Sequence, residues 1–314
     1  HTPNRTQPTI MGGHGGGRMR IGWVGVGVMG RHMAGHLMAA GHELSVFSRT
    51  ASKCAPLVEA GARLASSPMD AAYGADAVFT MVGAPSDVEQ VTLGGGGVLE
   101  ALEPGSLLID CTTSTPSLAQ RVAAAAAGKG VLALDAPVSG GDVGAEAASL
   151  SIMCGGSDEA MGGSGYLLDL LGSRVLHMGP AGAGQHTKMC NQILAANNML
   201  GVCESLRYAS AAGLDADVVV RAVGAGAAGS WAMNNLGHKV VANDFAPGFM
   251  IEHMAKDLGI AVSEAERLGL ELPGLANARR LYDALLAAGH GRDGTQALVL
   301  ALDSPTNPAV SPCR

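Results

Sequence analysis

Aromatic residues are scarce in this sequence: phenylalanine, tryptophan and tyrosine together make up 3% of its 314 residues. So few rings cannot build the stacking platforms that bind single-stranded nucleic acids. Acidic residues also outnumber basic ones, and the formal net charge is −7. The chain therefore lacks the general basic surface that attracts polyanions, and we expect no nucleic-acid partner.

Paired cysteines and long apolar runs are missing as well. None of the six cysteines forms a Cys-x-x-Cys motif, so we expect reduced thiols in a reducing compartment, the cytoplasm. No stretch of about 18 residues is free of charges and glycines, which predicts no membrane span and no membrane partner. Residues 1–18 lack the apolar core of a secretory signal. Their arginines and lack of acidic residues leave an organellar leader or an artificial extension open.

Glycine is abundant, with 46 residues, and hydrophobic residues make up 47% of the chain. The first half alternates short apolar runs with stretches of helical spacing, a rhythm that predicts a parallel sheet with helices on both faces. Pro85, Ser86 and Asp87 together predict the start of a helix, with Ser86 as its N-cap. The expected strands are residues 20–26, 44–47, 77–82, 106–110 and 131–134, and the other expected helices are 29–40, 52–60 and 116–127.

The pattern changes after about Gly179. Residues 187–212 contain no proline and predict a helix of more than 20 residues, and no alternating strand pattern follows them. Further helices are expected at 216–223, 255–267, 275–288 and 296–300. We therefore predict an α/β Rossmann domain, doubly wound and mostly parallel, at residues 19–180, and an all-α domain at 181–305, joined by a long interdomain helix. Residues 1–18 and 306–314 are expected to be disordered tails.

A glycine motif follows the first expected strand. Gly25, Gly27 and Gly30 form Gly-x-Gly-x-x-Gly between a strand and a helix, the context in which this motif binds a dinucleotide. One glycine makes the turn, one lets the pyrophosphate approach, and one lets helix and strand pack closely. The alternative is a purely structural glycine turn. The expected cofactor contacts in this loop are Gly25, Val26, Gly27, Val28, Met29 and Gly30.

The end of the second expected strand predicts which cofactor is used. An NAD site usually carries an acidic residue there for the ribose 2′-hydroxyl, but residues 46–53 contain no carboxylate. They contain Ser48, Arg49, Thr50 and Lys53, which suit a 2′-phosphate. We therefore favour NADP(H) over NAD(H). The alternative is that Arg49 and Lys53 are only solvated charges beside a helix.

Four segments in order resemble the 3-hydroxyisobutyrate dehydrogenase family of β-hydroxyacid dehydrogenases: residues 24–37, Asp135 to Gly141, Gly182 to Gln192, and Lys256 to Leu258. The resemblance covers roughly residues 20–302. It implies the two domains above, a homodimer or homotetramer, and reversible hydride transfer between a nicotinamide and a small β-hydroxyacid or its semialdehyde.

The resemblance also implies residue roles. Lys188 falls on the family's catalytic lysine, and Ser139, Gly140 and Gly141 fall on its substrate-carboxylate loop. Thr113 falls on the nicotinamide side and Lys256 on a cofactor-contacting lysine; Val82 is a further expected cofactor contact.

One position departs from the common pattern of the family. Members often carry asparagine four residues after the lysine, where this chain has Gln192, with Asn191 one residue before it. This Lys-x-x-Asn-Gln form resembles the tartronate semialdehyde reductase branch. Either amide could contact the substrate.

Lys188 suits the chemistry. Reducing an aldehyde by hydride leaves an alkoxide that needs a proton, and a lysine within hydrogen-bond reach can supply it and take it back. Burial, a nearby cation or a helix N-terminus would lower its pKa toward the working pH. The alternatives are a surface lysine at Lys188 and a plain turn at Ser139, Gly140 and Gly141.

Two further features have weaker interpretations. Trp231 either covers the substrate cavity or belongs to a core at a domain contact. His32 and His36 lie four residues apart but have no third ligand at a matching spacing, so we expect no metal.

We therefore predict an NADP-dependent reductase of a small semialdehyde such as tartronate semialdehyde (2-hydroxy-3-oxopropionate). Oxidation of 3-hydroxyisobutyrate, serine or threonine with NAD is the alternative. An imine reductase usually replaces the lysine with another proton donor, and a non-catalytic nucleotide-binding module would lose Lys188 or the loop at Ser139, so both are less favoured.

Overall fold

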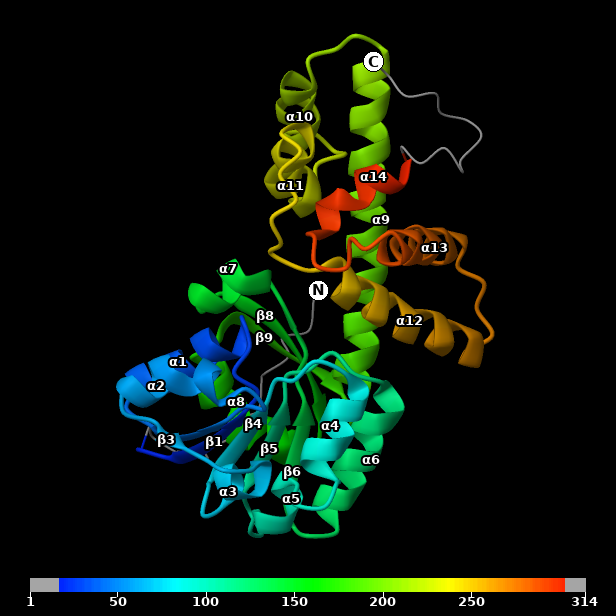
Figure 1. Ribbon diagram of the computed structural model, residues 1–314. Helices are drawn as coiled ribbons and strands as arrows, with labels where there is room; N and C mark the ends of the chain where they lie inside the picture. The colour runs from blue at the N-terminus through cyan, green and yellow to red at the C-terminus, as the bar shows by residue number, and fades with distance from the viewer. Residues whose placement is uncertain (1–16, 303–314) are drawn as a thin grey trace, which may run out of the picture.

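The computed structural model describes residues 17–302, and the predicted tails lie almost wholly outside this range. A sheet flanked by helices forms one part of the molecule and a group of helices forms the other, with helix α9 running from the first into the second (Figure 1). The predicted α/β domain followed by an all-helical domain is confirmed.

Nine strands form one mixed sheet in the described part of the chain, in the order β3-β2-β1-β4-β5-β6-β8-β7, with β9 beside β8. Strands β1 to β6 are parallel, β8 is antiparallel to β6 and β7, and β9 is parallel to β8. The strands are β1 Arg20–Val24, β2 Glu43–Phe47, β3 Arg63–Leu64, β4 Ala77–Thr80, β5 Leu107–Asp110, β6 Leu132–Asp135, β7 Val138–Ser139, β8 Leu150–Gly156 and β9 Gly172–Gly179.

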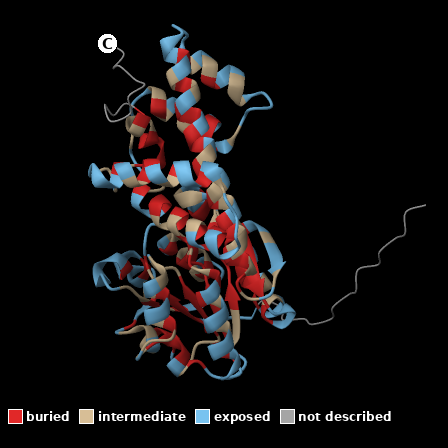
Figure 2. Ribbon diagram, turned by 90° about the vertical axis from the view of Figure 1, so that its right-hand side faces the viewer, coloured by how far each residue is buried: buried red, intermediate tan, exposed pale blue. Residues whose placement is uncertain are grey.

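The central strands are apolar on both faces, which explains why helices cover both. Neighbouring residues point to opposite sides: Trp23 joins one buried cluster and Val24 another, and Phe79 and Val78 divide in the same way. Figure 2 shows the buried residues gathered inside these layers. The helices of this part are α1 Gly30–Ala39, η1 Ala51–Cys54, α2 Ala55–Glu59, α3 Pro68–Ala72, α4 Pro85–Thr92, α5 Val98–Ala101, α6 Pro116–Ala127, α7 Gly141–Glu146 and α8 Asp158–Asp169.

The second part is helical, as predicted, and packs around α9 in one buried cluster. Helix α9 begins at Ala183, four residues before the predicted start, after Gly182 in the left-handed region. The helices are α9 Ala183–Ala211, α10 Ala216–Gly224, α11 Trp231–Val241, α12 Ile251–Arg267, α13 Pro273–Ala287, η2 Thr295–Leu298 and α14 Val299–Leu302.

Two local predictions are wrong. Ser86 does not cap α4, because the helix begins at Pro85 and Ala84 takes the N-cap position without a side-chain hydrogen bond. Trp231 is not a core residue: it is the first residue of α11 and 65% exposed. Ser230 caps that helix by accepting from the Met233 amide.

The start of α9 is fastened to the sheet by Asp135, the last residue of β6. One carboxylate oxygen accepts from the Gly182 amide at 2.7 Å and the other from the Gln185 amide at 2.8 Å. Both amides belong to the group that an α-helix leaves unpaired at its N-terminus. A Cβ at Gly184 would lie 2.3 Å from the Met153 oxygen, so only glycine permits this approach.

We predict that Asp135→Asn destabilises the protein. An amide has one accepting oxygen where the carboxylate has two, so one buried backbone N–H would lose its partner, at a cost of about 1–3 kcal/mol in the free energy of unfolding. Urea unfolding followed by circular dichroism measures the change. The control is Glu271→Gln, because Glu271 is exposed and lies in the loop before α13, outside the helices. Equal stability of Asp135→Asn and the parent protein would contradict this assignment.

Candidate active site

The glycine turn after β1 is built for close contact. Gly25 has φ +104°, and a Cβ there would lie 2.1 Å from the Met81 oxygen. A Cβ at Gly30 would lie 2.2 Å from the Gly25 oxygen, whereas nothing lies within 4 Å of one at Gly27. Gly25 and Gly30 are thus required by the fold, while the exposed Gly27 leaves open space above the turn. This is the cradle that a pyrophosphate needs.

Helix α1 follows this turn directly. Its first turn contains no acidic residue and its N-cap, Met29, makes no side-chain hydrogen bond, so its amides and the positive end of its dipole can receive phosphate. Val26 is buried and Val28 is 53% exposed beside the turn. The chain therefore fits a dinucleotide at the position the motif predicts.

The expected ribose end lies after β2, and there the structure adds a residue that the sequence did not reveal. Ser48 is half-buried, and Arg49 and Thr50 are exposed. The Arg49 guanidinium forms an ion pair with Asp87 of α4, with Nη1–Oδ1 at 2.9 Å and Nη2–Oδ2 at 3.3 Å. Arg49 is therefore not an unpaired surface charge, and a phosphate at this position would meet a guanidinium that already pairs with Asp87.

Lys188 is a buried amine. It is the sixth residue of α9 and only 6% exposed, and its Nζ donates to the Val138 oxygen at 2.9 Å. Burial lowers the pKa of Lys188 to about 8, with Lys256 acting in the same direction and Asp257 against it. The surface-lysine alternative is wrong. An amine with this pKa can give and take a proton near neutral pH.

The expected carboxylate loop meets Lys188 through the carbonyl of Val138. Ser139 is the next residue, half-buried at the end of β7. Gly140 and Gly141 then turn the chain with φ of +138° and +65°, conformations that residues with side chains rarely adopt. The structure thus brings Lys188 and the Ser139 loop together from positions about 50 residues apart.

The two amides after Lys188 form a chain of hydrogen bonds. Gln192 is 3% exposed, and its Nε2 donates to Asp257 Oδ2 at 2.6 Å. Asn191 is half-buried, and its Nδ2 donates to Gln192 Oε1 at 2.7 Å. Gln192 therefore shares the buried face with Lys188, while Asn191 lies at the edge of that face.

Lys256 joins α12 to the sheet. Its Nζ lies 2.9 Å from Asp257 Oδ1 and donates to the Thr113 oxygen at 2.9 Å. Two expected cofactor contacts are therefore in direct contact with each other. A third, Val82, donates its amide to Thr112 Oγ1 at 3.0 Å in the neighbouring loop.

Sequence reasoning missed the buried residues that hold this loop. Gln185 is fully buried; its Nε2 donates to the Thr112 oxygen and its Oε1 accepts from the Ser114 amide. Asp110, at the end of β5, accepts from Thr80 and from the Thr112 amide, and burial raises its pKa to about 6. The sequence signals are a glutamine between the glycines and Lys188, and an aspartate that ends an apolar run.

Trp231 is the predicted site residue that the structure does not join to the others. Helix α11 lies with α10 along the half of α9 farther from the sheet (Figure 1). His36, one of the two histidines considered for a metal, contacts the Ala145 oxygen at 2.9 Å. Within residues 17–302, no group of three side chains is arranged to hold a metal ion, and no helix has the length and apolar content needed to cross a membrane.

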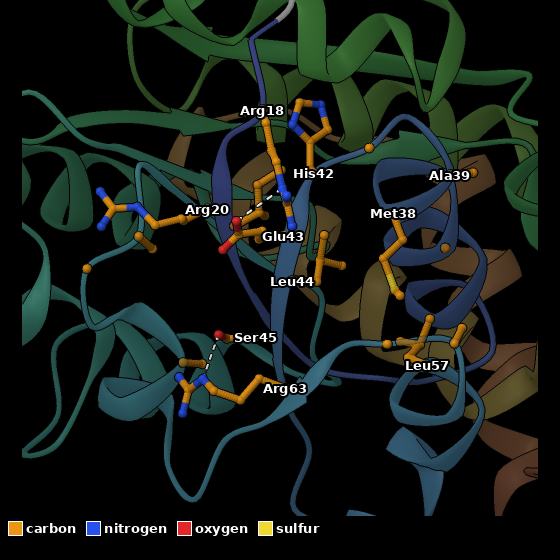
Figure 3. A pocket seen from close by; sticks show the side chains of 18 of the residues that line it. Arg18, Arg20, Met38, Ala39, His42, Glu43, Leu44, Ser45, Leu57 and Arg63 are labelled. Carbon is orange, nitrogen blue, oxygen red and sulfur yellow. Dashed lines mark hydrogen bonds and ion pairs between the residues drawn. The ribbon is translucent and has the colours of Figure 1, made fainter.

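A pocket of about 960 Å³ lies at the opposite edge of the sheet, around the amino ends of β1 and β2 (Figure 3). Its basic residues are already paired, as Arg18 is with Glu43 and Arg20 with Asp76. Arg63 is paired with Asp70 as well. Ligands of parallel sheets bind at the carboxyl ends of the strands, so we place the active site at the edge that carries the glycine turn and Lys188.

Known proteins match both parts of the chain. The family described as the NAD binding domain of 6-phosphogluconate dehydrogenase matches residues 20–179, and that described as NAD-binding of NADP-dependent 3-hydroxyisobutyrate dehydrogenase matches residues 182–302. A probable mitochondrial 3-hydroxyisobutyrate dehydrogenase-like protein of Arabidopsis thaliana is 48% identical, over 93% of this chain and 87% of its own.

Two further relatives share less sequence identity with this chain. An NAD-dependent L-serine dehydrogenase of Pseudomonas aeruginosa is 39% identical over 86% of this chain and 94% of its own. The structure of a Mycobacterium tuberculosis 3-hydroxyisobutyrate dehydrogenase with L-serine superposes with a TM-score of 0.83 at 31% identity, covering 91% of this chain and 100% of that one. The chain therefore belongs to the 3-hydroxyisobutyrate dehydrogenase family and is an NAD(P)-dependent hydroxyacid dehydrogenase acting on CH–OH groups.

Proposed function

We propose that this enzyme interconverts a small β-hydroxyacid and its semialdehyde with NADP(H), using Lys188 as the general acid and base. The observation that carries the proposal is the buried Lys188 amine, held at the Val138 carbonyl beside the Ser139 loop. The reaction needs a proton donor next to a turn that can bind a carboxylate, and the contact between Lys188 and the segment of Ser139 supports these two as that pair.

Each group has a distinct task in this mechanism. The bound nicotinamide supplies or accepts the hydride. The Ser139 hydroxyl and the amides of Gly140 and Gly141 hold the substrate carboxylate. Lys188 gives a proton to the oxygen of the reduced carbon and takes it back in the oxidative direction. Gln192 lies on the same helix face as Lys188, and its hydrogen bond to Asp257 keeps the polar side chains beside the amine in place.

We propose 2-hydroxy-3-oxopropionate as the preferred substrate, because Asn191 and Gln192 follow Lys188 in the order that resembles the tartronate semialdehyde reductase branch. The rivals are 3-hydroxyisobutyrate and L-serine with NAD, since relatives carry those names. All three substrates present a carboxylate and an oxygen on the β-carbon. A panel of these compounds with NADP(H) and NAD(H) tests the choice: highest kcat/KM for 3-hydroxyisobutyrate or L-serine would overturn it.

The proposal extends to assembly and location. Leu194 and Tyr208 of α9 are 63% and 75% exposed, which favours a homodimer or homotetramer that covers them. Light scattering after size-exclusion chromatography tests this point. Between residues 17 and 302, four of the five free cysteines are buried, namely Cys54, Cys111, Cys154 and Cys203, and Cys190 is exposed, in keeping with a cytoplasmic enzyme. The relative named as mitochondrial keeps an organelle as the alternative, which imaging of a tagged full chain decides.

We predict that Lys188→Ala lowers kcat at least about a hundredfold, the low end for loss of an acid–base group. Binding of NADPH, followed by its fluorescence, should persist because the glycine turn is intact. Lys239→Ala is the control, since that lysine lies on α11 and pairs with Asp244 at the surface. Undiminished turnover in Lys188→Ala would remove the amine from the mechanism.

The lowered pKa of Lys188 predicts opposite pH dependences for the two directions. Reduction needs the ammonium form, so its kcat/KM should fall as the pH rises through about 8. Oxidation needs the neutral amine, so its kcat/KM should rise through the same range. Rate profiles between about pH 6 and 10 measure both limbs. Lys188→Arg, which stays protonated, should lose them, and unchanged limbs in that variant would assign the titration to another group.

We predict that Arg49→Ala raises the KM for NADPH about tenfold or more and changes the KM for NADH less than twofold, because only NADPH carries the 2′-phosphate. Initial rates with each cofactor at saturating substrate give the two values. Arg174→Ala is the control, because Arg174 is an exposed residue of β9. Equal effects on the two cofactors would refute the NADP(H) assignment.

A further inference from the structure

The ion pair between Arg49 and Asp87 joins two segments that lie 38 residues apart. Arg49 follows β2 and Asp87 lies in the first turn of α4, where the helix dipole favours a negative charge. The two side chains face each other through two nitrogen–oxygen contacts, at 2.9 and 3.3 Å. The sequence around β2 does not indicate that a carboxylate lies beside Arg49.

The two partners are unequally held. The Asp87 side chain is 22% exposed, whereas that of Arg49 is 79% exposed. A Cβ at Gly83 would lie 3.1 Å from Asp87 Oδ2, so the glycine spares the carboxylate a tight contact. The aspartate is thus the more buried partner and the arginine the more exposed one. An exposed ion pair of this kind is weak, so a ligand phosphate can compete for the guanidinium.

We propose that Asp87 sets the cofactor preference of this enzyme, by competing with the 2′-phosphate of NADP(H) for Arg49. The inference rests on the proposed function, in which Arg49 reads that phosphate. Asp87 weakens NADP(H) binding in two ways: it occupies the guanidinium, and its own charge repels the phosphate. NAD(H) lacks the 2′-phosphate, so neither effect weakens its binding. Asp87 therefore reduces the difference in binding affinity between NADP(H) and NAD(H).

The test is Asp87→Asn, with dissociation constants for NADPH and NADH measured by fluorescence titration without substrate. The amide keeps the size of the side chain and removes its charge. We expect the dissociation constant for NADPH to fall about three- to tenfold, in proportion to the loss of an exposed ion pair and a like-charge contact. The value for NADH should stay within about twofold. Glu89→Gln is the matched control, because it lies in the same helix and pairs with Arg121 instead.

The double variant Arg49→Ala with Asp87→Asn separates this inference from the cofactor assignment. If competition for Arg49 is the mechanism, most of the gain from Asp87→Asn disappears when Arg49 is absent. A gain that persists in full overturns the competition. An unchanged NADPH-to-NADH ratio in Asp87→Asn, with NADPH still weakened by Arg49→Ala, overturns the role of Asp87 but leaves the NADP(H) proposal standing. If Arg49→Ala also affects both cofactors equally, the NADP(H) proposal itself fails.

Discussion

The contact on which the site depends is that between the Asp135 carboxylate and the N-terminus of α9. The same short segment, from the end of β6 into β7, provides both this carboxylate and the Val138 carbonyl that receives Lys188. Gln185 and Lys188 lie within one turn of each other. The start of the helix and its amine are therefore held by residues only three apart in the chain, and a shift of either contact would move the amine relative to the Ser139 loop.

Burial disfavours the ionised form of the Asp135 carboxyl group, and hydrogen bonds from the backbone favour it. Burial raises the pKa of Asp135 to about 7, while the Gly182 and Gln185 amides lower it. The carboxylate can approach the helix this closely because glycines lie on both sides of it. A Cβ at Gly155 would lie 2.5 Å from Asp135 Oδ1, and Gly184 is equally confined. The Gln185 side chain donates to the Thr112 oxygen and so extends these contacts to the loop after β5.

Much of the fold could be predicted from the spacing of apolar residues and from the prolines and glycines that begin or end helices. Helix α6 was predicted with its observed bounds, because Pro116 starts it and Gly128 ends it. The segment between β7 and α9 was not predicted as elements. Strand β8 ends in glycines, and β9 is exposed over most of its length because it is an edge strand. Neither has the continuous apolar run or the alternation by which strands are read.

The site divides in the same way. Lys188 and Ser139 were predicted because each lies in a short motif that resembles one of the family's motifs. Asp87 and Gln185 were missed because their roles depend on partners 38 and 71 residues away, and such pairing is a property of the folded chain alone. Residues 46–53 contain no carboxylate, yet the fold brings Asp87 of α4 to Arg49.

The two cations of the site show how burial decides what a charge can do. Lys188 is 6% exposed and donates to a neutral carbonyl, so it cannot exchange partners freely and its pKa falls instead. The Arg49 side chain is 79% exposed and faces a carboxylate, so its guanidinium can exchange that partner for another anion. Proton transfer, as proposed for Lys188, needs the first behaviour, and reversible phosphate binding, as proposed for Arg49, needs the second. The fold places Lys188 beside the Ser139 loop and Arg49 after β2.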